Sequence, residues 1–179
     1  MSNATEPASS ASSLKRVALG DLEQELATTR RVLERVPEEH FGWKPHEKSM
    51  SLGALATHLA TLPFWGSTTI GTDELDIAAN PLPPNPLAEN REALLARFDD
   101  RAGALRAALE GADDEALLRP WTFRSGDHVI LRGPKMGIVR TMVVSHMAHH
   151  RGQLSVYLRL LDVPVPSVYG PTADEPAAF

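Results

Sequence analysis

Residues 145–154 read SHMAHHRGQL and contain three of the seven histidines of this 179-residue chain, at positions 146, 149 and 150. They lie within a longer segment whose apolar residues recur at helical spacing, which predicts a helix over residues 136–161. At about 100° per residue, one face of this helix collects the following apolar residues: Val139, Met142, Val143, Leu154, Tyr157 and Leu161.

The histidines differ in their position relative to this apolar face. His146 and His150 lie within about 20° of its centre, His149 about 80° from it, and Arg151 is turned well away. Two histidines four residues apart project to one spot on a helix, as in the zinc-binding H-x-x-x-H pattern. The spacing also permits a 146/149 pair, but the apolar face favours 146/150.

A metal site is the favoured interpretation of this pair, with two alternatives. The histidines could be hydrogen-bonded core residues, or they could form a solvated polar face. A zinc-protease mechanism is disfavoured, because Met147 stands where that motif carries its glutamate base.

Composition narrows the chemistry. The chain has no cysteine, so histidine and carboxylate are its available metal ligands, and any thiol must come from a bound molecule. A formal charge of −5 disfavours nucleic-acid binding. Residues 1–13 are small and polar and lack the features of a signal peptide, so a disordered leader is expected. With no apolar run of about 18 residues, we expect no membrane association and a cytoplasmic protein.

Two helices are predicted in the first part of the chain. Residues 13–36 keep an apolar face that ends before Pro37, and residues 51–70 carry leucines at 52, 55, 59 and 62 behind a capping Ser51 or Ser49. His58 lies beside this leucine face. A lone histidine there is more often a core residue, but as a third partner for His146 and His150 it would complete a metal site between two helices.

The remaining segments suggest one bundle. Residues 71–86 are a proline-rich crossover, and Asn85-Pro86 is interpreted as the start of a third helix that continues to Gly111. A short helical turn is expected at residues 113–118. Residues 121–131 could form an irregular hairpin or a loop, and we assign them as a loop. His128, which lies in this segment, is expected to be exposed. After residue 161 the prolines predict an extended tail that Tyr169 fastens. The sequence therefore predicts an all-α four-helix bundle as a single domain, residues 14–179.

Two blocks of this sequence resemble the DinB-like, damage-inducible family, which is unrelated to the DNA polymerase of the same name. The C-terminal block is His146-x-x-His149-His150-Arg151-Gly152-Gln153-Leu154, followed by the motifs at 157–160, 163–166 and 169–171. The earlier block runs from Trp43 to Gly53 and into Leu55-Ala56-x-His58. The match spans residues 14–175.

The resemblance implies an up-down-down-up bundle, commonly dimeric, with a divalent metal on three histidines that correspond to His58, His146 and His150. Members of known chemistry are thiol transferases or isomerases that use bacillithiol, mycothiol or glutathione. Many other members have no established activity. This chain lacks the extra C-terminal domain of the mycothiol-dependent isomerases, which disfavours that subfamily.

Three functions remain open at this point: a metal-dependent thiol S-transferase acting on an electrophile, a non-catalytic metal-binding stress-response protein, and a metal-dependent hydrolase. A metal with open positions acidifies a thiol or a water that binds it, so it serves both reactions. Gln153 is a candidate hydrogen-bond partner for a ligand histidine, or a packing residue. Zinc or nickel is the expected metal. Iron and copper also suit imidazole ligands, and manganese is a further alternative. A homodimer is expected from the resemblance and from Val144 and Val156, which lie outside the main apolar face.

Overall fold

The structure is a computed structural model that describes residues 13–177. The expected leader lies outside the described residues except for Ser13, where the first helix begins. The helical elements are α1 (Ser13–Glu34), η1 (Glu38–His40), α2 (Leu52–Thr61), α3 (Pro63–Gly71), α4 (Arg91–Gly111), α5 (Asp114–Leu118), α6 (Lys135–Val139), η2 (Arg140–Ser145) and α7 (His146–Leu160). Three short strands accompany them, β1 (Glu74–Asp76), β2 (Pro120–Ser125) and β3 (His128–Pro134).

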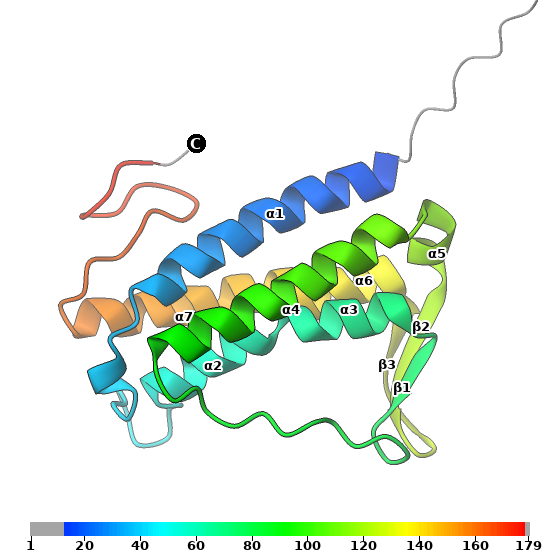
Figure 1. The fold of residues 1–179 in the computed structure, drawn as a ribbon, viewed down its shortest axis with the longest axis horizontal. Helices are drawn as coiled ribbons and strands as arrows, with labels where there is room; N and C mark the ends of the chain where they lie inside the picture. Colours follow the sequence, from blue (N-terminus) through cyan, green and yellow to red (C-terminus); the bar gives the residue numbers. More distant parts are fainter. Residues whose placement is uncertain (1–12, 178–179) are drawn as a thin grey trace, which may run out of the picture.

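The helices form four rods that pack around one core (Figure 1). The first rod is α1, the second is α2 with α3, the third is α4, and the fourth is α6, η2 and α7. The first rod packs against the third and fourth, and the second packs against the same two. The second and third rods run in the same direction because a long crossover joins them, so the order is up-down-down-up (Figure 1). The predicted four-helix bundle is confirmed.

The core is built mainly from leucines that recur on the inner faces of the rods. Leu26, Leu55, Leu59, Leu105 and Leu154 are among its fully buried side chains. Burying a side chain of this size stabilises the fold by about 1.5–3 kcal/mol. None of the helices in residues 13–177 is long and apolar enough to cross a lipid bilayer.

The second rod is interrupted, where one helix over residues 51–70 was predicted. Pro63 has no backbone N–H to donate to Leu59, so α2 ends at Thr61 and α3 begins at Pro63. Leu62 keeps helical angles (φ −55°, ψ −35°), and the two helices therefore follow one another closely. The predicted cap is confirmed, since Ser51 accepts a hydrogen bond from the Ala54 N–H at 3.2 Å.

The start of the third rod was predicted wrongly. Asn90, not Asn85, caps α4, and its Oδ1 accepts a hydrogen bond from the Ala93 N–H at 2.8 Å. Asn85 instead accepts hydrogen bonds from Thr61 Oγ1 and Arg97 Nη1, both at 3.1 Å. The Asn-Pro pair therefore fastens the crossover to the second and third rods.

The loop predicted over residues 121–131 is also wrong, because this segment forms most of a hairpin. β2 pairs antiparallel with β3, and Gly126, with φ +57°, lies in the turn between them. β1 comes from the crossover and pairs parallel with β2, so the small sheet closes one end of the bundle (Figure 1). Trp121 is fully buried, and its Nε1–H donates to Thr72 Oγ1 at 2.9 Å. This tertiary contact stabilises a hairpin that local sequence left ambiguous.

The fourth rod covers the predicted range but is not a uniform α-helix. Residues 140–145 form a π-helical segment immediately before His146. The tail after α7 begins at Asp162, which has a positive φ of 57°. It then runs back along the bundle without regular secondary structure. Glu175 pairs with Arg31 of α1 and with Arg35, which follows the end of α1.

Candidate metal centre

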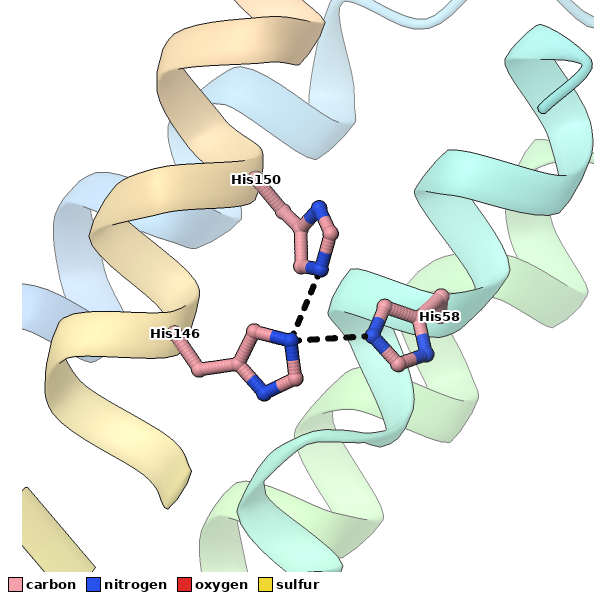
Figure 2. A group of neighbouring side chains, drawn as sticks. All are labelled: His58, His146 and His150. Atoms are coloured by element: carbon pink, nitrogen blue, oxygen red, sulfur yellow. Dashed lines mark hydrogen bonds between the residues drawn. The ribbon is translucent and has the colours of Figure 1, made fainter. Parts of the chain in front are cut away.

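Three histidines from two rods converge at one point (Figure 2). His58 comes from α2, and His146 and His150 come from consecutive turns of α7. The Nε2 atom of His146 lies 2.8 Å from that of His150 and 3.4 Å from that of His58. All three rings are partly buried. The structure thus brings together the three histidines that the sequence predicted as metal ligands.

The outer nitrogens of two of these rings are held by acceptors. His150 Nδ1 lies 2.7 Å from the Gln153 side-chain oxygen, which can only accept, so the hydrogen of the neutral ring is on Nδ1. His146 hydrogen-bonds the Met142 carbonyl, and since its Nε2 faces the other histidines, that bond leaves from Nδ1. Both rings therefore direct an unprotonated Nε2 lone pair towards the common centre.

The environment keeps all three rings neutral. Burial lowers the pKa of His58 to about 4, with His150 and His146 contributing in the same direction. Burial also lowers the pKa of His146 and His150; for His150 the hydrogen bond to Gln153 opposes this effect. Neutral imidazole is the form that binds a metal ion.

The donor set fits a divalent metal. With metal–nitrogen bonds of about 2.0–2.1 Å, a tetrahedral site would place its nitrogens about 3.3 Å apart. The two separations from His146 Nε2 are 2.8 and 3.4 Å, and all three ligand atoms lie within 4.8 Å of one another. Converging lone pairs repel one another, and a cation between them removes that repulsion. Within residues 13–177, no fourth histidine and no carboxylate joins this cluster, so three side chains could hold a metal ion here.

The other two histidines considered from the sequence lie apart from the centre. His149 is exposed, and its ring packs edge-on against the outside of His150, with centroids 4.8 Å apart. His128 is exposed on β3, as predicted. The pair within α7 is therefore 146/150, not 146/149.

A constant rotation of about 100° per residue predicts the pair whose rings converge, His146 and His150, but it predicts the wrong buried face. The buried residues of α7 are Met147, Arg151, Leu154 and Leu158, so the two histidines lie at the edge of the buried face. Arg151, expected to point away from the core, is only 1% exposed. The cause is the π-helical segment: its i→i+5 bonding makes a constant 100° per residue invalid across residues 140–145.

An aromatic pair lies farther along the same helix. Trp43 packs edge-on against Tyr157, with ring centroids 5.6 Å apart, and the Tyr157 hydroxyl donates to the Met50 carbonyl at 3.3 Å. This pair joins the link before α2 to α7. A separate apolar groove of about 540 Å³ lies between α1, α6 and the end of α4, and none of the three histidines lines it.

Comparison with known proteins identifies the family of this chain. Residues 1–178 match the DinB family. The chain belongs to the DinB family. A curated relative of this DinB chain, the uncharacterized protein YrdA of Bacillus subtilis (strain 168), is 27% identical over 164 residues, which cover 88% of this chain and 89% of YrdA.

Solved structures of DinB-like proteins share the fold. The protein YjoA from Bacillus subtilis superposes with a TM-score of 0.66 at 20% identity, covering 84% of this chain and 96% of its own. A DinB-like protein from Bacillus cereus ATCC 10987 gives 0.63 at 21% identity, with 86% and 97% covered. At these identities the likeness establishes the bundle architecture of this DinB chain.

Proposed function

We propose that this chain binds a divalent transition metal through His58, His146 and His150 and uses it to activate a low-molecular-weight thiol, which loses its proton and attacks an electrophile through its sulfur. The observation that carries the proposal is the convergence of three Nε2 atoms, with two of the rings held from outside by Gln153 and Met142. Such outer hydrogen bonds orient metal-binding histidines and fix their tautomers.

The metal, when bound, would supply Lewis acidity that lowers the pKa of a coordinating thiol or water. The chain has no cysteine and so provides no sulfur nucleophile of its own. A three-ligand set leaves coordination positions for a small molecule, which is the arrangement of catalytic rather than structural metal sites. This supports an enzyme over a metal-storage or purely structural role.

The residues of the chain have separate roles in this proposal. His58 connects the second rod to the fourth through the site, and His146 and His150 supply the pair on α7. Gln153 holds His150 in the tautomer whose Nε2 is free. Zinc or nickel is proposed as the metal because imidazole ligands suit both. Iron and copper also bind imidazole, so the three rings alone do not select among these four metals.

The reaction also suggests a location. Low-molecular-weight thiols stay reduced in the cytosol, where reducing systems maintain them. We therefore propose that the protein works in the cytoplasm, with a small thiol and an electrophile as its two small-molecule partners.

The test begins with metal content. Protein purified without a metal-chelate column is analysed for bound elements, then stripped and reloaded with zinc or nickel. Thiol conjugation is followed with glutathione, bacillithiol and mycothiol against a panel of electrophiles, and ester hydrolysis is followed in parallel without thiol. We expect thiol consumption that needs the metal and is lost in His150→Ala. Thiol-independent hydrolysis would favour the hydrolase instead, and stoichiometric metal without turnover of either kind would favour the non-catalytic role.

A further inference from the structure

Arg151, the residue after His150, is almost completely enclosed by hydrogen-bond acceptors. Its Nη1 donates to Thr29 Oγ1 at 3.0 Å and to the Glu25 carbonyl at 3.2 Å. Its Nη2 donates to the Glu25 carboxylate at 2.7 Å and to the Tyr169 hydroxyl at 2.6 Å. An arginine with this many partners has a planar head fixed in position and in orientation.

The network connects three separate parts of the chain. Arg151 belongs to α7, Glu25 and Thr29 belong to α1, and Tyr169 belongs to the C-terminal tail. The Tyr169 hydroxyl also donates to the Glu25 carboxylate at 2.9 Å, and its ring lies against the Arg151 guanidinium, 5.0 Å from carbon to centroid. Burial of the hydroxyl end and the bond to Glu25 raise the pKa of Tyr169, which keeps this hydroxyl available as a donor.

The position of Arg151 links this network to the histidines. Adjacent helix residues are about 100° apart around the axis, so fixing the direction of Arg151 towards α1 fixes the direction of His150 towards α2. The π-helical segment before His146 departs from the angular spacing of a uniform α-helix, so contacts within α7 itself, such as those of Arg151, help to set the direction of its side chains.

We propose that Arg151, Glu25 and Tyr169 are positioning residues that set the rotation of α7 and thereby aim His146 and His150 at His58. The tail takes part in this function through one hydroxyl group, that of Tyr169. The inference rests on the proposed metal site, but the orientation of the His150 ring can be measured without metal.

Tyr169→Phe is the most informative variant. Phenylalanine keeps the aromatic ring, and Tyr169 is 59% exposed as a whole residue, so this variant removes little more than the hydroxyl and its hydrogen bonds. Arg151→Lys keeps the positive charge, but a lysine has one ammonium group and cannot replace the hydrogen bonds made by both Nη1 and Nη2 of Arg151. Asp174→Asn is the matched control: Asp174 also fastens the tail, to Arg159 and to the Val165 N–H at 2.8 Å, but touches no member of the network.

The experiment uses the full chain and two readouts. Cobalt(II) binding gives the affinity and the visible absorption spectrum of the site, and a long-range ¹H–¹⁵N spectrum of the metal-free protein reports the ring tautomer of His150. In Tyr169→Phe we expect the cobalt affinity to weaken by about 10-fold, the lower end of the effect typical of residues that orient metal-binding histidines, with an altered spectrum and shifted His150 nitrogens. The changes should be larger in Arg151→Lys and absent in Asp174→Asn.

Wild-type affinity, spectrum and ring-nitrogen shifts in both Tyr169→Phe and Arg151→Lys would overturn the positioning role, even if their melting temperatures fall. Equal changes in Asp174→Asn would also overturn the positioning role. They would show that any loosening of the C-terminal tail alters the site, whether or not the Arg151 network is intact. If the wild-type protein binds no cobalt, the proposed metal function fails, and the ring-nitrogen spectra still decide whether Arg151 and Tyr169 orient His150.

Discussion

His150 and Gln153 form a hydrogen-bonded pair one turn apart on α7, with Nδ1 and Oε1 separated by 2.7 Å. The Gln153 side chain is exposed and the ring is partly buried, so the bond is made at the outer rim of the site. Because the amide oxygen can only accept, this contact selects the tautomer of His150 that leaves Nε2 free.

Replacing Gln153 by leucine is therefore expected to weaken metal binding by roughly 10- to 100-fold. Gln153→Glu keeps an acceptor at the same place and should retain most of the affinity. A competition titration against a chromophoric chelator measures both variants. Equal affinities of wild type and Gln153→Leu would show that the hydrogen bond does not contribute to binding.

The three converging histidines should each be necessary for tight metal binding. His58→Ala, His146→Ala and His150→Ala each remove one of three ligands, and we expect stoichiometric metal to be lost or greatly weakened in elemental analysis after dialysis. His128→Ala should bind as wild type, and His149→Ala should show only a mild effect, because its exposed ring lies outside the cluster. Loss in His149→Ala with full retention in His150→Ala would contradict the 146/150 assignment.

The lowered histidine pKa values predict how stability depends on pH. In the unfolded chain histidine titrates near 6.5, whereas burial lowers the pKa of all three site histidines in the fold, that of His58 to about 4. The unfolded state therefore binds more protons below about pH 6.5, and the metal-free protein should lose stability as pH falls from there towards 4. Melting temperatures between pH 7.5 and 5, above most carboxylate titration, test this, and His58→Asn should give a shallower slope.

The lowered pKa values of the three site histidines also affect the metal-bound protein. Bound metal adds stability by mass action, and protons displace it only when they bind the folded histidines. The holo melting temperature should exceed the apo value near pH 7.5, and the gap should shrink as the pH falls below 6.5 towards the lowered folded pKa values. A gap that stays constant down to pH 4 would show that histidines do not dominate the coordination.

Gly66 lies where the second rod packs tightly against the third and fourth rods. A Cβ at this position would lie 2.6 Å from Leu105 Cδ1 and 3.2 Å from Val143 Cγ2. Gly66→Ala should therefore destabilise the fold by about 1–3 kcal/mol through overpacking, less about 1 kcal/mol of gained helix propensity. Gly103→Ala is the matched control, since nothing lies within 4 Å of a Cβ there, and it should be slightly stabilising. Urea unfolding of both variants measures the difference.

A homodimer is predicted from the family and from apolar side chains that the single chain leaves uncovered. Val156 and Leu160, one turn apart on α7, are 56% and 57% exposed. Light scattering should give twice the 19.5 kDa mass of one chain, and Val156→Lys should shift the protein towards monomer if this face forms the contact. A monomer mass for the wild type at micromolar concentration would contradict the prediction.

The bundle and its histidine cluster were predictable because their patterns are local. Helical spacing of apolar residues reveals each rod, and His146 and His150 are four residues apart in one of them. His58 could be placed beside them because one histidine on the leucine face of a second rod can complete the set, and the family resemblance selects the same residue. Metal binding itself stays a prediction.

The features that the sequence did not predict depend on contacts between residues that are far apart along the chain. Arg151 is buried because Glu25, Thr29 and Tyr169 surround it, and a charged residue gives no sign of such burial when considered alone. The β2–β3 hairpin depends on Trp121 reaching Thr72, and on a strand contributed by the crossover. The π-helical segment has no clear local sequence pattern. The buried face of α7 therefore could not be predicted from the apolar residues that precede this segment.

The separation of the three histidines along the chain has a consequence for how the protein folds. His58 and His146 are 88 residues apart in sequence, so the complete set of ligands exists only after the last rod has docked onto the second. His146 and His150 form a local pair as soon as one helix forms. Bound metal would thus tie together two distant points of a chain that has no cysteine, much as a disulfide does, by closing a long loop worth about 4–5 kcal/mol of unfolded-chain entropy. Such a cross-link is reversible, and free metal concentration rather than redox potential would determine whether it is made.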